Sequence, residues 1–236
     1  ALIWVEYSAN KKTGQDIWNH VKQYANNHIS ELKLDLNNKE VLMIPNLLSQ
    51  SEMCLATREI NEDTYTISRL RGNELIDIFT IQIQNAFALL GFKDQSVFFV
   101  RRYHEDSTYY TYSIFEISSF SENELVRFQS KNWIRPSINS NCDILYSISD
   151  NQTQHIMLLR RNGVPEEVTT GSFPIWYDTN SFLYVFEKQL KKCDTKQLVS
   201  EDFLTSSGMI ISIQLNPYSG NSLYLSSDKK NLIYGI

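Results

Sequence analysis

The 236-residue sequence predicts an all-β fold of the β-propeller class, with six four-stranded blades. A short pattern occurs twice in register, 38 residues apart, so that Pro136 matches Pro174 and Tyr146 matches Tyr184. Six short apolar segments also recur along the chain, with a mean step of 44 residues between their centres. A period of ~40–45 residues made of short strands and turns is typical of propeller blades. The repeat therefore predicts the architecture.

We interpret the six apolar segments as the second strand of each blade, counted outward from the propeller axis. A strand that is covered on both faces is apolar at successive positions, whereas a half-exposed strand alternates. The six segments are centred on Trp4, Leu55, Phe98, Tyr146, Tyr184 and Tyr224.

The remaining strands are expected between these centres. The second and third blades are predicted to consist of residues 40–48, 53–60, 64–71 and 74–82, and of residues 86–92, 96–103, 109–117 and 124–129. In the fourth blade, residues 155–161 and 166–170 flank the turn at 162–165. Turn-forming clusters separate these segments at intervals of roughly 8–15 residues, as in other short-stranded folds.

Four segments carry a more specific or a more ambiguous pattern. Polar and apolar residues alternate in 64–70 and in 109–115, which predicts strands that are half exposed. Residues 16–28 and 187–198 fit helical spacing as well as strand spacing. A short helix or an irregular insertion at either place is therefore an alternative to a strand.

Residues 1–236 are expected to form a single propeller domain whose first and last blades are incomplete. The first blade begins at its second strand, and the last ends after the segment 231–236. If the two terminal segments form one blade together, the propeller has five blades instead of six. A fragment of a larger propeller is the third possibility.

Composition excludes some classes of partner. The net charge is −5 and the sequence contains no long basic block, so we expect no nucleic-acid partner. The longest apolar run, residues 86–92, is far shorter than the ~20 residues that span a bilayer, so we expect no transmembrane segment.

The first residue is Ala1 instead of Met, which is compatible with processing and export. We therefore predict a periplasmic or extracellular location, with the cytoplasm as the alternative.

The cysteines and the turn residues are informative in different ways. Cys54, Cys142 and Cys193 are odd in number and far apart, so we expect three small buried side chains, although one disulfide remains possible. The chain has 8 Gly and 20 Asn. Because Asn tolerates left-handed backbone conformations and hydrogen-bonds within its own turn, it can replace Gly at chain reversals.

One segment, "EEVTTGSFPIWYDTNSFLYVF" at residues 166–186, resembles the WD-like repeat of TolB-type propellers. The matching positions are Val168-Thr169, then Pro174, Trp176 and Tyr177-Asp178, then the apolar strand 182–186. Where the family usually has Ser-Pro-Asp-Gly in the turn, this chain has residues 177–180, "YDTN". Residues 136–148 match less well, and the first 130 residues match only by spacing. The resemblance implies a propeller scaffold and transfers no catalytic residue.

The candidate binding residues lie in loops that are expected to gather on one face of the propeller. In the predicted register these loops join the fourth strand of a blade to the next blade, or the second strand to the third. Exposed aromatic residues and arginine are the usual centres of binding energy at protein interfaces. The candidates are Arg101, Tyr103, His104, Trp133 and Phe173, and Arg102 is the alternative to Arg101. An alternative for Trp133 and Phe173 is that both pack between blades.

The sequence predicts a non-catalytic scaffold that binds a protein or another ligand, resembling an envelope component of the TolB type. No GxSxG, HExxH, GxxxxGK[ST] or GxGxxG pattern occurs, and no cofactor or metal is expected. Adjacent acids such as Glu166-Glu167 and Glu201-Asp202 point to opposite faces of a strand, which makes them poor catalytic pairs. The alternative is a propeller enzyme acting on carbohydrate, or the propeller portion of a larger peptidase. The oligomeric state does not follow from the sequence.

Overall fold

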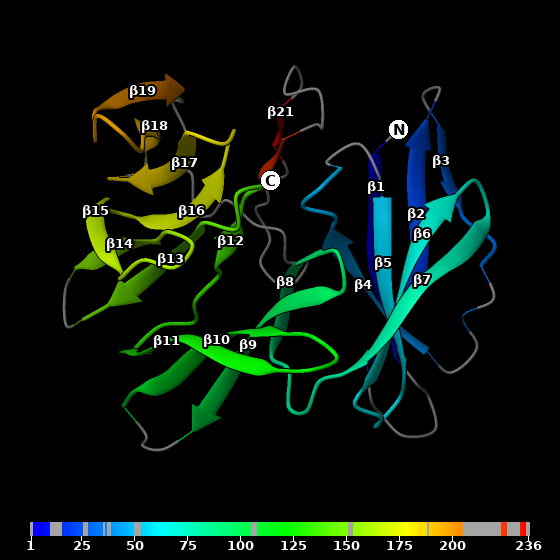
Figure 1. Cartoon of the computed structure of the whole chain (residues 1–236). Helices are drawn as coiled ribbons and strands as arrows, with labels where there is room; N and C mark the ends of the chain where they lie inside the picture. Colours follow the sequence, from blue (N-terminus) through cyan, green and yellow to red (C-terminus); the bar gives the residue numbers. More distant parts are fainter. Residues whose placement is uncertain are drawn as a thin grey trace. The chain divides into compact units, whose positions relative to one another are not determined.

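The computed structural model describes residues 2–9, 16–25, 28–34, 36, 39–49, 53–104, 108–150, 153–187, 189–204, 223–225 and 232–234. Every regular element in this part of the chain is a β-strand (Figure 1). The strands form six separate sheets, and in each sheet strands that follow one another in sequence are neighbours. Such a series of antiparallel meanders is the blade arrangement of a β-propeller. The predicted fold class, all-β with propeller blades, is confirmed.

The first two sheets have the strand orders β1-β2-β3 and β4-β5-β6-β7. Their strands are β1 (Leu2–Ala9), β2 (Asp16–Ala25), β3 (His28–Glu31), β4 (Lys39–Pro45), β5 (Met53–Glu59), β6 (Thr64–Arg71) and β7 (Glu74–Gln82). The third sheet has the order β11-β10-β9-β8. It consists of β8 (Ala88–Lys93), β9 (Ser96–His104), β10 (Tyr110–Ile117) and β11 (Glu122–Ser130).

The last three sheets are β12-β13-β14-β15, β16-β17-β18-β19 and the pair β20-β21. The fourth sheet consists of β12 (Ser137–Ile138), β13 (Ile144–Ser149), β14 (Gln154–Leu159) and β15 (Glu166–Thr170). The fifth consists of β16 (Ser172–Trp176), β17 (Ser181–Phe186), β18 (Gln189–Asp194) and β19 (Ser200–Leu204). The final pair is β20 (Leu223–Leu225) and β21 (Leu232–Tyr234).

All six predicted centres lie in strands, namely β1, β5, β9, β13, β17 and β20. Four of these, β5, β9, β13 and β17, are the second strands of four-stranded sheets, as predicted, whereas β1 and β20 are the first strands of their sheets within the described residues. Strands β6 and β7 have the predicted bounds. The two ambiguous segments contain β2 and β18, so both form strands and not helices.

One prediction of exposure is wrong. The alternating segment 109–115 was expected to be half exposed, but β10 is buried along almost its whole length, from Thr111 to Phe115. The large side chains of Tyr112 and Ile114 are inaccessible, and Thr111 and Ser113 are buried as well. Threonine and serine are small enough to be covered on the second face of an inner strand. Their polarity in the sequence therefore gave a false signal of exposure.

The chain divides into two compact units, each of which has its own apolar core. Unit 1 consists of Ala1–Val100 and Phe115–Asn123, and unit 2 of Arg101–Ile114 and Glu124–Ile236. The core of unit 1 includes Tyr65, Ile67, Phe92, Phe99 and Phe115. The rings of Phe99 and Phe115 are stacked, with 5.2 Å between their centroids. The core of unit 2 includes Leu145, Ile156, Leu158, Phe182 and Tyr184. Cys54, Cys142 and Cys193 are buried and unbridged, as expected for small apolar side chains.

The 38-residue repeat marks a seam between β12 and β16 inside unit 2. The indole Nε1 of Trp176 donates a hydrogen bond to the carbonyl oxygen of Ser137 at 3.2 Å, and Ser137 Oγ donates to the carbonyl oxygen of Pro174 at 3.1 Å. Asn139 Nδ2 adds a bond to the carbonyl oxygen of Thr179 at 3.2 Å. The repeat therefore places an aromatic side chain and a polar turn where two consecutive sheets meet.

Asx turns close the hairpins, as the Asn-rich composition predicts. Asp178 Oδ1 accepts the backbone N–H groups of Asn180 and Ser181, each at 2.8 Å. Asp194 Oδ1 does the same for Lys196 and Gln197, also at 2.8 Å. Left-handed backbone angles occur at several turn residues of this type, including Asn61, Asn85, Asp94 and Asn162.

Gly171 connects β15 to β16 at a point where no side chain fits. Its φ is +147°, and a Cβ atom added there would lie 2.6 Å from Cδ2 of Tyr184 and 2.8 Å from the carbonyl oxygen of Val185. The close approach of the connection to the buried strand β17 therefore requires glycine.

We predict that Gly171→Ala lowers the free energy of unfolding by about 1–3 kcal/mol more than Gly72→Ala, because overpacking of a filled site typically costs that amount. Gly72 is a matched control, since its φ is also positive, +62°, but nothing lies within 4 Å of an added Cβ. Equilibrium unfolding in urea measures both values. Equal losses for the two variants would show that the contact with Tyr184 and Val185 is not the constraint.

Candidate binding surface

The structure places two of the predicted binding residues, Tyr103 and Trp133, in two separate cation–aromatic contacts in unit 2. Arg101 and Tyr103 lie on β9, and Trp133 lies in the segment between β11 and β12. Tyr103 contacts Arg127, and Trp133 contacts Arg102. Predicted residue His104 ends β9, and its side chain lies outside the described part of the structure.

Phe173 has a different environment. It is half-buried and packs against a cluster formed by Leu183, Val185 and Leu190. Its φ of 54° is in the left-handed region, which is unusual for an aromatic residue, and it lies at the register shift between Ser172 and Ile175. The cluster belongs to β17 and β18 of the same sheet, so Phe173 packs on its own sheet.

Arg102 holds the indole of Trp133 in place. Its guanidinium carbon lies 5.3 Å from the ring centroid of Tyr110 and 5.1 Å from that of Trp133. The cation therefore contacts two aromatic rings. Trp133 nevertheless remains 56% exposed. A cation over a ring face is attracted by the ring quadrupole, and the attraction limits the rotation of both side chains. The result is a large exposed aromatic group with a restricted conformation.

Two more cation–aromatic pairs lie on the same strands and the same connection. Arg127 of β11 lies 5.6 Å from the ring centroid of Tyr103, and the ammonium of Lys131 lies 5.2 Å from that of Tyr109. The Arg127 guanidinium also binds Glu124, with 2.7 Å between Nη2 and Oε2. This hydrogen bond holds the pKa of Glu124 below its usual value. Because Arg102 and Tyr103 are consecutive residues of β9, the contacts of Arg102 and the contact of Tyr103 lie on opposite faces of the sheet.

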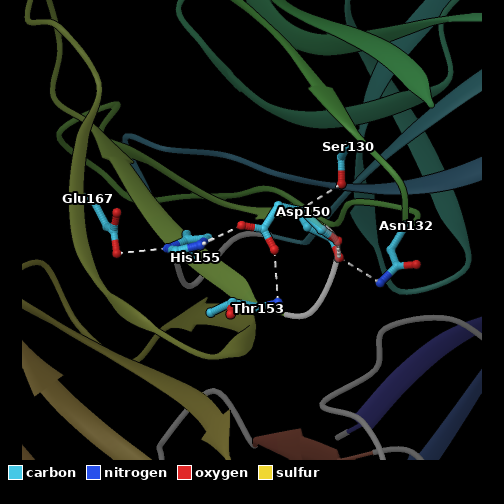
Figure 2. A network of polar contacts seen from close by, with 7 residues as sticks. Ser130, Asn132, Asp150, Thr153, His155 and Glu167 are labelled. Carbon is cyan, nitrogen blue, oxygen red and sulfur yellow. Dashed lines mark hydrogen bonds and ion pairs between the residues drawn. The ribbon is translucent and has the colours of Figure 1, made fainter. Parts of the chain in front are cut away.

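Hydrogen bonds attach the segment between β11 and β12 to the end of β13. Asn132 Nδ2 donates to Ser149 Oγ at 3.0 Å, and the backbone N–H of Ser149 donates to Ser130 Oγ at 3.1 Å (Figure 2). The N–H of Lys131 donates to the carbonyl oxygen of Ser149 at 3.2 Å. The buried Tyr112 hydroxyl approaches the carbonyl oxygen of Asn132 at 3.5 Å, and burial raises the pKa of Tyr112 to about 12. The segment that carries Trp133 is therefore fixed at several points.

His155 lies between two carboxylates at the start of β14. Its Nδ1 is 2.9 Å from Glu167 Oε1, and its Nε2 is 3.4 Å from Asp150 Oδ2. Figure 2 shows the three side chains in a row, with Asp150 also accepting the backbone N–H of Thr153 at 2.9 Å. The hydrogen bond to Glu167 is the main reason that the pKa of His155 is raised. Both ring nitrogens face an acceptor, which favours the charged imidazolium.

The carboxylates of this part of the chain are paired with cations on neighbouring strands and turns. Adjacent acids are attached to separate cations, since Glu166 pairs with Arg160 at 3.1 Å while Glu167 pairs with His155. Asp202 likewise pairs with Lys191 at 2.9 Å. These pairs confirm that neighbouring carboxylates on a strand serve different partners. In the described part of the chain, no group of three or more His, Cys, Asp or Glu side chains has the geometry to hold a metal ion.

Sequence reasoning missed Arg127, the partner of Tyr103, and Tyr110, the second ring on Arg102, as well as the Lys131–Tyr109 pair and the contacts of His155. Knowledge of the sheet order β11-β10-β9 would have identified Arg127 and Tyr110, because it places these strands in one sheet. His155 is harder to find. A register shift after Ile156 leaves His155 opposite Thr170 and sets Glu167 opposite Met157.

Comparison with known proteins supports the fold. No family model and no curated protein matches the sequence. The acylaminoacyl peptidase of Pyrococcus horikoshii is similar in structure, with a TM-score of 0.53, 10% identity, and coverage of 94% of this chain and 38% of the peptidase. TolB from Acinetobacter baumannii matches with a TM-score of 0.39 and 10% identity over 84% of this chain and 62% of TolB. This chain therefore spans less than two thirds of either protein.

A third similar structure is the oligogalacturonate lyase of Vibrio parahaemolyticus, with a TM-score of 0.28, 8% identity, and coverage of 99% of this chain and 96% of the lyase. At such identities the likeness concerns the fold alone. Within the described residues, no helix is long and apolar enough to cross a membrane.

We predict that His155→Gln destabilises the protein more in mild acid than in mild alkali. The folded state raises the pKa of His155, so its contribution is complete below the unfolded pKa of about 6.5 and is lost as pH rises through the folded value. Urea unfolding at about pH 5.5 and about pH 8.5, on either side of the ordinary histidine pKa, measures the difference. The exposed His28 provides a matched control as His28→Gln. A loss that is the same at both pH values would contradict a charged imidazolium between two carboxylates.

Proposed function

We propose that this chain is a binding scaffold that displays the segment between β11 and β12 to a protein partner. The observation that carries the proposal is Trp133, which is 56% exposed and is held by Arg102, itself in contact with Tyr110. Tryptophan, tyrosine and arginine dominate the binding energy of protein interfaces. A side chain whose conformation is already restricted loses less entropy when a partner covers it.

The charges around Trp133 favour an acidic partner surface. Arg102 contacts Trp133, and Lys131 lies two residues before it, although the chain as a whole carries a net charge of −5. Local positive charge on a chain of opposite net charge directs an acidic partner to one place on the surface.

We infer further that the six sheets are the blades of a single propeller domain of the TolB type, formed by residues 1–236. The sheets follow one another in sequence, and within the described residues the first has three strands and the last two. A shared blade built from the terminal sheets gives the five-bladed alternative. The non-catalytic scaffold role and a periplasmic or extracellular location go with the TolB resemblance, and no nucleic acid or cofactor takes part in the proposed role.

A second candidate is the propeller portion of a longer peptidase. The structural likeness to the acylaminoacyl peptidase of Pyrococcus horikoshii favours it, because 94% of this chain aligns with only 38% of that protein. In that case the surface around Trp133 binds another part of the same polypeptide. A carbohydrate-active propeller remains the third reading, and it requires two carboxylates about 5–9 Å apart across a sugar site.

We predict that Trp133→Ala weakens capture of the partner at least tenfold, because hot-spot tryptophans contribute about 2 kcal/mol or more. Immobilised wild-type protein and variants are exposed to cytoplasmic and extracytoplasmic fractions of the source cells, and retained proteins are quantified by mass spectrometry. The strongest protein is then purified, and its affinity is measured by calorimetry. Phe120→Ala is the matched control, since Phe120 is 96% exposed and belongs to unit 1.

The three readings give different outcomes. A purified partner that binds wild type and Trp133→Ala equally would refute the proposed surface. An antibody against this chain that detects, in source cells, a polypeptide well above 27.5 kDa with peptidase activity would support the second candidate instead. A partner found in the cytoplasmic fraction would overturn the proposed location and leave the surface intact.

A further inference from the structure

Arg135 is a half-buried arginine with an unsatisfied donor. It lies two residues after Trp133 and two residues before β12, between the buried Ile134 and Pro136. Its Nη1 atom is shielded from solvent and has no hydrogen-bond partner among the described residues. Burial alone lowers the pKa of Arg135. A guanidinium removed from water without a compensating anion is costly, and native proteins rarely retain one without a use.

Other arginines of the chain have carboxylate partners. Arg58 binds Glu40 at 2.6 Å, Arg127 binds Glu124 at 2.7 Å, and Arg160 binds Glu166 at 3.1 Å. Each of these cations is neutralised by a nearby acid, whereas no acid contributes to the shifted pKa of Arg135. Arg135 differs from these three arginines, because its buried Nη1 has no hydrogen-bond partner among the described residues.

The backbone that carries Arg135 is fixed. The N–H of Ile134 hydrogen-bonds the Tyr112 side chain, and Asn132 is attached to Ser149 at 3.0 Å. Proline at 136 restricts the residue before it to extended conformations. Arg135 therefore starts from a defined position, and binding a ligand requires little additional ordering of the chain.

The chemistry of the surroundings favours an anion. Lys131 lies four residues before Arg135 in the same segment. Arg102 contacts Trp133, which lies two residues before Arg135. Because Nη1 is withdrawn from water, the attraction between the guanidinium and an anion is less screened than at a surface arginine. The planar fork of arginine matches the two oxygens of a carboxylate or a phosphate.

We propose that Arg135 is the centre of an oxyanion-binding site that accepts a carboxylate or a phosphate group. The site does not depend on the partner proposed above, because a small free anion suffices to occupy it. An acidic side chain or a chain terminus of a partner presents the same chemistry. Arg135 then supplies the charge-assisted hydrogen bonds, and Trp133 supplies apolar surface beside them.

The test uses inorganic phosphate and acetate as separate probes at constant ionic strength. In wild-type protein, we expect at least one of them to raise the thermal midpoint of unfolding in a saturable manner, with chloride as the reference. Arg135→Met removes this response. Arg135→Lys weakens it about tenfold, since a point charge replaces a bidentate fork. Arg71→Met, which removes an exposed arginine of unit 1, is the matched control and keeps the full response.

The stability of Arg135→Met without added anion gives a second readout. Replacement of an unpaired buried cation by an apolar side chain is expected to leave the protein at least as stable as wild type. If this variant does not fold, titration of ¹⁵N-arginine-labelled wild-type protein with each anion tests the site directly. A saturable shift of one guanidinium resonance, absent from the spectrum of Arg135→Lys, is the expected result.

Two outcomes would overturn the proposal. One is an equal response of wild type and Arg135→Met to both anions, which indicates general ion effects. The other is the absence of any saturable response in wild type to either probe. A response to acetate alone indicates a carboxylate ligand, and a response to phosphate alone indicates a phosphate ligand, so the two sources are distinguished.

Discussion

The burial of the second strand on both faces in the four four-stranded sheets is the constraint on which the rest of the described structure depends. Leu55, Phe98, Tyr146 and Tyr184, at the centres of β5, β9, β13 and β17, are at most 2% exposed. A strand of this kind must be apolar at successive positions, and its neighbours must cover it from both sides. Each sheet is thereby tied to the core at its second strand, while its outer strands and connections are free to vary.

This constraint explains how much of the fold the sequence predicts. A strand that is apolar on both faces cannot be exchanged for a loop without exposing a large area, so the six centres are visible in a single sequence. The bounds of β6 and β7 were also predictable, because Gly72 and the turn at 61–63 delimit them. By contrast, β10 was predicted to be half exposed, because buried threonine and serine have the same polarity as exposed ones.

The candidate site was less predictable for a geometric reason. The sequence predicts Trp133 and Tyr103 as exposed aromatic residues of loops, but Tyr103 lies on β9, and the cationic partners of both come from other segments. The contact between His155 and Glu167 depends on a bulge in the β14–β15 pair. A shift of one residue in pairing changes which side chains are neighbours, and local sequence contains little information on such a shift. Pairings across strands therefore have to be observed.

The same division between fixed strands and variable connections governs how function can be assigned. A structural likeness at 10% identity to the acylaminoacyl peptidase of Pyrococcus horikoshii shows that the scaffold persists when nearly all side chains differ. The two-sided burial of the second strands requires apolar volume and not particular residues, so it does not distinguish a scaffold from an enzyme. The segment between β11 and β12 is different, because burial of the core does not explain an exposed tryptophan held by arginine, or a buried arginine Nη1 that has no hydrogen-bond partner among the described residues. Features that the fold does not require are the ones that carry information on binding. Trp133 and Arg135 lie within this one short connection, which makes it the place where the function of this chain is to be sought.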